Sequence, residues 1–189
     1  NKNCLLHQRE IGTHATSFAD ALRAAGREDP DVILVGELRD LETISMALSA
    51  AERGTIVFAT LHTNNAIKTV DRIISVFPAG EQEGARNVIA ESLRSVVAQQ
   101  LLPREGGGRV AAVEIVFATP AISNLIRRGK ISQITSIIQG GTKLGMVDMD
   151  TAIRTLYEEG LISARSAYDK AIDKDLFKDL VEEVTVTVD

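Results

Sequence analysis

The chain has 189 residues, of which 44% are hydrophobic and 25% are charged, an ordinary composition for a globular protein. The net charge of −5 provides no basic footprint, so we expect no nucleic-acid partner. The single cysteine, Cys4, excludes an internal disulfide and a four-cysteine zinc site, and fits a reducing compartment. No apolar stretch approaches the roughly 18 residues that span a bilayer, and no signal-peptide pattern is present, so the sequence predicts a cytoplasmic protein.

The chain opens with a short apolar run and a first helix. Residues 4–6 could close a short strand. Ser17, with Asp20 three residues later, is a plausible helix start, and the helix is expected to end near Gly26.

A second set of signals predicts a strand and a helix. Pro30 marks the start of an element, because proline fits neither a helix interior nor a central strand. The apolar, β-branched run Val32–Val35 is typical of a strand that is buried on both faces. Asp40 is a good N-cap for a helix over 41–53, which Gly54 ends.

Residues 55–62 form a second apolar run, so strand, helix and strand follow one another with short joins. This order predicts a βαβ unit, whose two strands run parallel with a right-handed crossover. Glu37 follows the first strand and His62 lies at the end of the second. Because ligands bind beyond the carboxyl ends of parallel strands, we expect both side chains at one shared edge.

The remainder of the chain is predicted to be helices around one hairpin. The expected helices cover 66–76, 81–97, 119–127, 131–138, 148–159, 163–171 and 174–184, and the expected strands cover 99–102 and 110–117. The triple glycine 106–108 is interpreted as the hairpin turn and not as a phosphate cradle, because neither Lys-Ser/Thr nor a helix follows it. The tail 184–188 alternates like a strand, but pairing and disorder are equally compatible with its terminal position.

Glu37 is the first candidate for chemistry. A carboxylate beyond a strand can hold a magnesium ion, directly or through water, because magnesium prefers oxygen ligands. The alternative is a surface glutamate after a core strand. Arg39 could bear on a phosphate or on a neighbouring subunit, although we favour an ion pair with Asp40 or Glu42. His7 and His14 are interpreted as surface or structural residues, and the histidine spacing predicts no zinc site.

Residues 28–40, Glu-Asp-Pro-Asp-Val-Ile-Leu-Val-Gly-Glu-Leu-Arg-Asp, resemble the Walker B signature of the type II/IV secretion and pilus ATPases. Within that family, the chain is most similar to the PilT-type pilus retraction ATPases, over nearly all of its length but only to the later part of a full subunit. The resemblance implies an α/β, RecA-like P-loop ATPase core with parallel strands over 1–118 and a helical C-terminal region over 119–189. It also implies that Glu37 is the Walker B glutamate at the magnesium ion.

Residues 60–63, Thr-Leu-His-Thr, are similar to the His box of the same family. An imidazole there could hydrogen-bond the γ-phosphate or an adjacent side chain and so report the presence of the phosphate, whereas a capped loop histidine is the alternative. The resemblance implies catalytic roles for Glu37 and His62. The residues that it implies for ATP binding are Glu37, Arg39, Asp40, Thr60, His62 and Thr63.

Two parts of a complete ATP site do not occur in the sequence. Residues 8–12 and 16–18 resemble the segment that follows the acidic Asp box, so the Asp-box carboxylates are expected upstream of Asn1. No G-x-x-x-x-G-K-[ST] motif is present, although this P-loop supplies the amides and the lysine that hold the phosphates. We therefore expect ATP and Mg²⁺ to be cofactors of the full subunit, and the chain alone to be inactive.

One further motif resembles the AIRNLI motif of the retraction ATPases and is a candidate effector or partner surface. It consists of Ala121, Ile122, Ser123, Asn124, Leu125 and Ile126. Ser123 stands where the family usually has arginine, which puts a charge-dependent contact in doubt. The alternative is a plain amphipathic helix, which accounts for the apolar positions but not for Asn124.

The resemblance as a whole implies part of a hexameric ATPase motor that powers type IV pilus retraction at the cytoplasmic face of the inner membrane. Its implied partners are further copies of the subunit, the membrane pilus platform and the pilin machinery. A pilus assembly or type II secretion ATPase is one alternative, although such proteins usually carry a four-cysteine zinc insert. A non-catalytic interaction module is the other alternative, and the missing P-loop is its best support.

Overall fold

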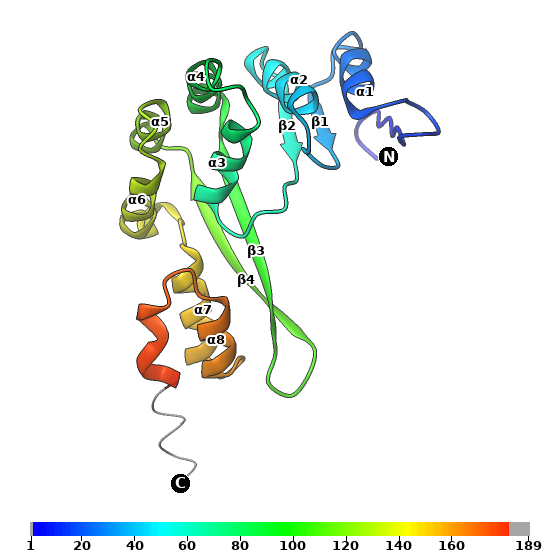
Figure 1. The fold of residues 1–189 in the computed structure, drawn as a ribbon. Helices are drawn as coiled ribbons and strands as arrows, with labels where there is room; N and C mark the ends of the chain where they lie inside the picture. The colour runs from blue at the N-terminus through cyan, green and yellow to red at the C-terminus, as the bar shows by residue number, and fades with distance from the viewer. Residues whose placement is uncertain (1, 182–189) are drawn as a thin grey trace. The chain divides into compact units, whose positions relative to one another are not determined.

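The computed structural model describes residues 2–181, and its contacts divide the chain into two compact units (Figure 1). The first unit comprises the chain up to His62 together with Ile73–Ser92, and the second comprises Thr63–Arg72 and the chain from Leu93 onward. The predicted boundary between 1–118 and 119–189, which rests on family resemblance, stays a prediction.

Each unit contains both helices and strands. The first unit contains α1 (Phe18–Ala25), β1 (Val32–Val35), α2 (Leu41–Glu52), β2 (Ile56–Ala59) and α4 (Gln82–Ser92). The second contains β3 (Ser95–Pro103), β4 (Arg109–Phe117), α5 (Pro120–Arg127), α6 (Ile134–Gly140), α7 (Met149–Glu158), α8 (Ala164–Lys170), and 3₁₀ turns at Ile131–Gln133, Thr142–Leu144 and Asp175–Phe177. Helix α3 (Ala66–Ser75) begins in the second unit and ends in the first.

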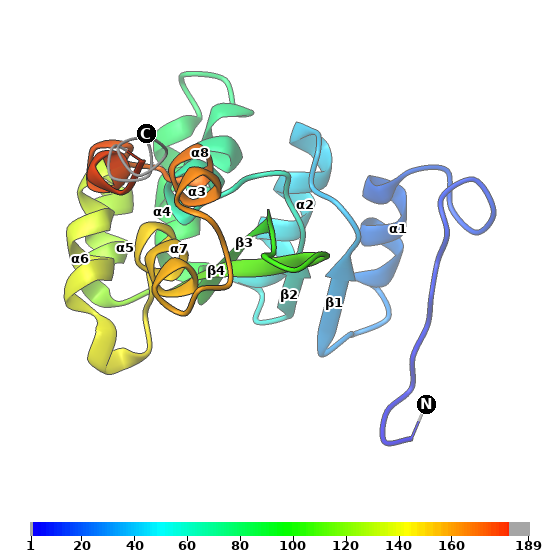
Figure 2. The same ribbon diagram turned by 90° about the horizontal axis from the view of Figure 1, so that it is seen from below.

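The predicted βαβ unit is confirmed. Strands β1 and β2 pair in parallel, with Val32 opposite Ile56 and Val35 opposite Ala59, and they lie side by side next to α1 and α2 in Figure 2. Asp40 caps α2 as predicted, because its carboxylate accepts the backbone N–H of Thr43 at 2.8 Å. The two strands therefore end at the same edge of their sheet.

Burial on both faces was predicted for β1, and burial was also expected for β2; neither prediction is correct for the described part of the chain. Val35 is 3% exposed, but Leu34 and Phe58, which lie opposite each other, are 74% and 58% exposed. Helix α2 packs against β2, while within the described part of the first unit no element covers the face that bears Leu34 and Phe58. The apolar composition reflects a face suited to burial, which a two-stranded sheet with helices on one side leaves open.

The second unit is built on a long antiparallel hairpin of β3 and β4, in which Ser95 lies opposite Phe117 and Pro103 opposite Arg109. The triple glycine forms its turn, as predicted, with φ of 82°, 110° and 78° at positions 106–108 that only glycine adopts easily. The predicted helix over 81–97 ends at Ser92 instead, and its last residues belong to β3.

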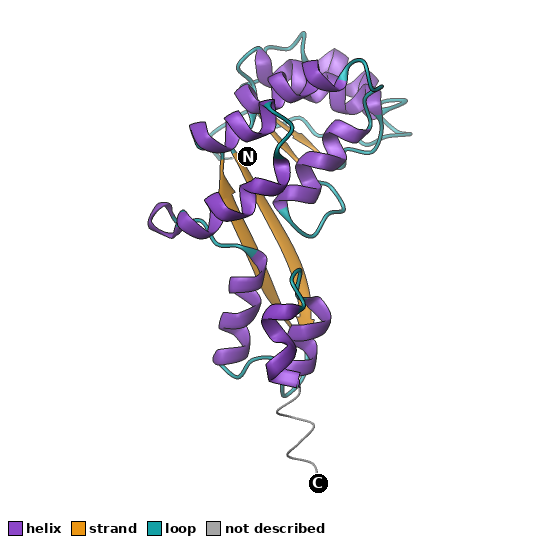
Figure 3. Cartoon of the chain, turned by 60° about the vertical axis from the view of Figure 1, so that its left-hand side comes forward, coloured by secondary structure: helices purple, strands orange, loops and turns teal. Residues whose placement is uncertain are grey.

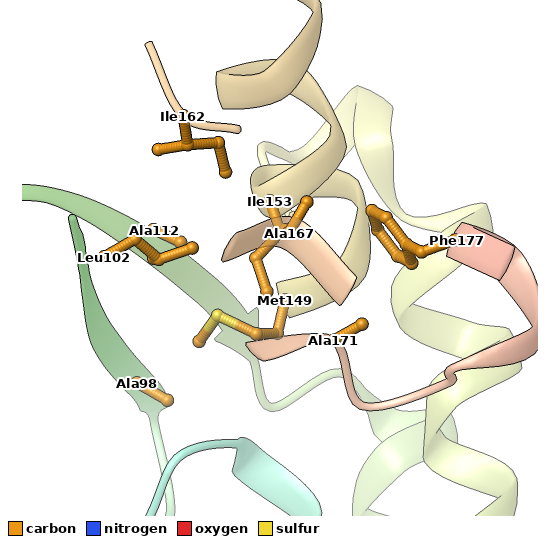
Figure 4. Close-up of a cluster of buried hydrophobic side chains, with 9 residues drawn as sticks. All are labelled: Ala98, Leu102, Ala112, Met149, Ile153, Ile162, Ala167, Ala171 and Phe177. Carbon is orange, nitrogen blue, oxygen red and sulfur yellow. The ribbon is translucent and has the colours of Figure 1, made fainter. Parts of the chain in front are cut away.

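Helix α7 packs against β4 and helix α8 against β3, and the two helices close the core of the second unit (Figures 3 and 4). Leu102 of β3, Ile153 of α7 and Phe177 are at most 1% exposed. The full cluster consists of Ala98, Leu102, Ala112, Met149, Ile153, Ile162, Ala167, Ala171 and Phe177. The C-terminal helices thus share one apolar core with the hairpin.

Most predicted helices are confirmed within a residue or two. Thr119 caps α5, with Pro120 in its first turn. The predicted strand at 4–6 is wrong, because these residues belong to no element and Leu5 is 82% exposed. The predicted helix at 174–184 starts with a 3₁₀ turn, and its end and the tail 184–188 lie outside the described residues.

The shared core predicts a sharp difference between two apolar positions of the second unit. Ile153→Ala should lower the free energy of unfolding by about 2–5 kcal/mol, because it leaves a cavity among well-packed side chains. Leu144→Ala, at a side chain that is 61% exposed, should change it by no more than about 0.5 kcal/mol. Urea unfolding followed by circular dichroism measures both, and equal losses would contradict this description of the core.

Candidate functional site

Glu37 and His62, which the sequence predicts at one shared edge, are in direct contact in the first unit. Glu37 lies two residues beyond β1 and His62 three residues beyond β2. His62 Nε2 is 2.9 Å from Glu37 Oε1. The Glu37 side chain is 18% exposed and that of His62 is 83% exposed, so the acid is sheltered while the imidazole faces solvent. The predicted convergence is confirmed.

Backbone pairing beyond the strand ends produces this contact. The N–H of Leu38 donates to the carbonyl oxygen of Thr60 at 3.0 Å, and the Thr60 hydroxyl donates to the carbonyl oxygen of Gly36. These two bonds hold the segment that carries Glu37 alongside the segment that carries His62. Thr60 therefore acts here as a support for the acid and the imidazole.

Arg39 also binds Glu37. Its Nη2 lies 2.5 Å from Glu37 Oε2, so the two carboxylate oxygens of Glu37 have different partners. The predicted ion pair of Arg39 with Asp40 or Glu42 is wrong. Glu42 instead pairs with Arg23 at 2.8 Å, and Asp40 uses its carboxylate to accept the N–H and the hydroxyl of Thr43. Asp40 is thus a helix cap within the signature.

The site keeps its carboxylates ionised. The hydrogen bond from Arg39 lowers the pKa of Glu37, and the charges of Arg39 and His62 act in the same direction. Glu37 in turn raises the pKa of Arg39. The backbone hydrogen bond from Thr43 lowers the pKa of Asp40. Glu37 consequently offers an anionic oxygen at neutral pH, which suits a hard cation.

The carboxylate of Glu37 fits magnesium as one ligand among several. Among the residues that the structure describes, no three His, Cys, Asp or Glu side chains gather into a metal cluster. Magnesium does not need such a cluster, because it is commonly held by one or two carboxylates together with phosphate oxygens and water. Since both oxygens of Glu37 are engaged by Arg39 and His62, an ion would displace one of them or bind through water.

Thr63 and His14 have hydrogen-bond partners of their own. The Thr63 hydroxyl shares a hydrogen bond of 2.7 Å with that of Thr69, in the second unit. His14 accepts the backbone N–H of Glu10 at 3.2 Å through Nδ1, in agreement with a structural role.

In the described part of the chain, no helix is long and apolar enough to cross a membrane.

The AIRNLI-like motif occupies α5 and is divided between core and surface. Ile122 and Ile126 are at most 1% exposed, as the amphipathic interpretation predicts. That interpretation also expects Leu125 in the core, but Leu125 is only half-buried. Ala121, Asn124 and Leu125 line an open groove of about 390 Å³. Gln133, Ser136 and Ile137 from the following turn and α6 complete its lining. Asn124, which the amphipathic pattern does not account for, therefore lies at a groove.

Sequence reasoning passed over Glu114, a buried acid in β4 that is 5% exposed and binds two helix starts. The available signal was its position as the single charged residue inside the apolar run 110–117. A charged residue is seldom fully buried unless it has partners, so an acid inside an apolar strand predicts hydrogen-bond donors around its carboxylate.

The contacts of Glu37 predict its titration. Because the native state favours the ionised form, the stability that Glu37 contributes is present above its unfolded pKa and is lost as pH falls through the lower folded pKa. Arg39→Gln should move the pKa of Glu37 upward, as measured by carboxyl ¹³C NMR. Arg9→Gln, which removes an arginine that pairs with Glu28 in the same unit, should leave it unchanged. An unmoved Glu37 titration in the Arg39 variant would contradict the assignment.

Comparisons with known proteins show which family the chain resembles over most of its length. The type II/IV secretion system protein family matches residues 6–167. The type IV pilus retractation ATPase PilT of Pseudomonas aeruginosa is 54% identical over 171 residues, covering 90% of this chain and 50% of that protein. A twitching motility protein of Neisseria gonorrhoeae is 54% identical over 172 residues, covering 90% of this chain and 46% of that protein.

The fold leads to the same family. A crystal structure of the pilus retraction motor PilT with bound ADP superposes with a TM-score of 0.82 at 48% identity, covering 89% of this chain and 48% of that one. This likeness confirms the predicted α/β architecture. The chain spans about half the length of these relatives. On this similarity of sequence and structure, the chain belongs to the type II/IV secretion system protein family.

Proposed function

We propose that the chain is the later part of an ATPase subunit of the PilT type, which powers type IV pilus retraction by ATP hydrolysis. The observation that carries the proposal is the 2.9 Å contact between Glu37 and His62 beyond two parallel strands. The similarity to a retraction ATPase and to a motor that binds ADP supports it. The single cysteine weighs against the zinc-containing assembly type.

Each residue of the site has a defined task in this proposal. Glu37 would hold the magnesium ion, whose charge offsets that of the phosphates. His62 is 83% exposed and contacts Glu37, and in this proposal its imidazole would hydrogen-bond the γ-phosphate. Arg39, 72% exposed, would leave Glu37 for a phosphate oxygen when the cation arrives. Asp40 caps the helix that follows Glu37, and Thr60 joins the segment of Glu37 to that of His62. Thr63 begins the segment that follows His62.

The nucleotide site needs more than this chain. No P-loop motif occurs in the 189 residues, so the amides and the lysine that bind the phosphates must come from the rest of the subunit. We therefore expect the isolated chain to be inactive. A non-catalytic module would fit the same absence, and the two differ in whether the complete protein carries a Walker A lysine.

The proposed assembly is a hexameric ring at the cytoplasmic face of the inner membrane, in which subunit closure around ATP drives pilin disassembly. The groove on α5 and α6 is the proposed contact surface for the pilus machinery, because it gathers Ala121, Asn124 and Leu125 without using the buried isoleucines of the motif. Ser123, half-buried, lacks the charge that the family motif usually has there.

Glu37 can be tested in the complete subunit. Glu37→Gln should lower kcat for ATP hydrolysis by roughly a hundredfold or more, because a neutral amide holds less firmly the magnesium ion whose charge offsets that of the reacting phosphates. His62→Ala should lower kcat as well. Glu42→Gln, which removes an exposed acid paired with Arg23, is the matched control and should retain activity. A steady-state phosphate-release assay measures all three, with the 189-residue chain as the inactive reference; full activity of Glu37→Gln would refute the proposal.

The groove predicts a separation of hydrolysis from movement. Asn124→Arg in the complete subunit should abolish twitching while ATP hydrolysis stays within about twofold of wild type, because Asn124 lies at the groove and away from Glu37 in the chain. Gln139→Arg, on α6 but outside the groove lining, should leave both unchanged. Twitching zones and phosphate release measure the two effects, and normal twitching of the Asn124 variant would rule out this surface.

A further inference from the structure

Glu114 of β4 binds two helices through one buried carboxylate. Glu114 is 5% exposed. Oε1 accepts the backbone N–H of Ala66 at the start of α3, and Oε2 accepts the backbone N–H of Met149 at the start of α7, the latter at 3.1 Å. All three residues belong to the second unit. They are 48 and 35 positions apart from Glu114 in the sequence, so the contact is fully tertiary.

The two helix starts have the same construction. Asn65 precedes α3 and its Oδ1 accepts the N–H of Lys68 at 2.8 Å, while Asp148 precedes α7 and its Oδ1 accepts the N–H of Thr151 at 3.1 Å. The first N–H groups of a helix lack partners inside it. Each cap residue binds the third N–H of its helix, and Glu114 binds the first N–H of both. Its carboxylate also lies at the positive end of two helix dipoles.

Further bonds make this junction rigid. Ile115, next to Glu114, exchanges two backbone hydrogen bonds with Val147 at 2.9 and 3.0 Å. On the other side, the Thr69 hydroxyl donates to the carbonyl oxygen of Asn65 at 2.8 Å and shares a 2.7 Å hydrogen bond with the hydroxyl of Thr63. The segment that directly follows His62 is therefore held to the start of α3, and α3 to Glu114.

We propose that Glu114 is a positioning residue that couples the start of α3, and with it the segment after His62, to the start of α7. A displacement of His62 when the phosphate arrives or leaves would then reach the C-terminal helices through one carboxylate. The coupling between the two helix starts is a property of the second unit by itself, whereas its use in sensing nucleotide rests on the proposed function.

The chemistry requires a carboxylate at this position. Two acceptor oxygens face two N–H donors, whereas a glutamine has one acceptor oxygen and an NH₂ group that would face a donor. Burial raises the pKa of Glu114, and the charges of Asp148 and Asp150 act in the same direction, whereas the hydrogen bonds from the N–H groups of Ala66 and Met149 lower it. Glu114→Gln should therefore keep one helix start bound and release the other, without a change of side-chain size.

Amide hydrogen exchange on the 189-residue chain tests the coupling. Asp148→Ala removes the cap of α7 without touching α3, and it should raise the exchange rate of the Ala66 amide about fivefold or more relative to Leu102 of β3. Ser163→Ala removes the equivalent cap of the neighbouring α8 and should leave Ala66 unchanged. In the Glu114→Gln background, Asp148→Ala should no longer affect Ala66. An unaffected Ala66 with Glu114 in place, or an equal effect of Ser163→Ala, would overturn the proposal.

Kinetics of the complete subunit test the use of this coupling. Glu114→Gln should lower kcat while the KM for ATP stays within about twofold, because the nucleotide contacts remain and the response of the helices is lost. Ser163→Ala should change neither constant. A changed KM with unchanged kcat would overturn the sensing role. If His62→Ala retained full activity, the proposed function would fail, but the exchange experiment would still decide whether Glu114 couples the two helices.

Discussion

The parallel pairing of β1 and β2, continued past their ends, is the interaction on which the site depends. Four opposed residue pairs fix the register, and the bond from Leu38 to Thr60 extends it toward Glu37 and His62. A slip of one residue would turn every side chain to the other face of the sheet. The same pairing that builds the sheet therefore places an acid against an imidazole.

Carboxylates in this chain are divided between scaffolding and chemistry by their partners. Asp40 and Asp148 accept N–H groups of their own helices, and Glu114 accepts those of two distant helices. Among the described residues 2–181, the partners of Glu37 are the side chains of Arg39 and His62, which can move away without breaking a helix. Because an acid with exchangeable partners can release them for a cation, we propose Glu37, and not Asp40, as the magnesium ligand within the signature.

Local patterns predicted the parts of the fold that local physics controls. Asp40 and Ser17 were recognisable as helix starts because capping depends on residues a few positions apart. The convergence of Glu37 and His62 followed from the parallel strands of a βαβ unit, whose carboxyl ends lie at the same edge of the sheet. The end of α4 was mispredicted because Val96 and Val97 suit a helical stripe as well as a strand, and only pairing with β4 decides between them.

Other features depend on what lies across space, which no local pattern contains. The apolar residues of β1 and β2 predict a face suited to burial but not what covers it, so Leu34 and Phe58 were expected inside and are exposed. Arg39 has acids at three nearby positions, and the backbone path decides that Glu37 is its partner. The partners of Glu114 could not be predicted, because both N–H groups that donate to its carboxylate come from distant segments.

The central claim is that Glu37 and His62 share one nucleotide edge, and a paramagnetic cation reports on it most directly. In the complete subunit with Mn²⁺ and ATP, histidine ring NMR signals near the bound ion broaden. The account predicts strong broadening of His62, with its neighbour Glu37 at the ion, and far weaker broadening of His7. Equal broadening of the two histidines, or a sharp His62 signal at saturating Mn²⁺–ATP, would contradict it.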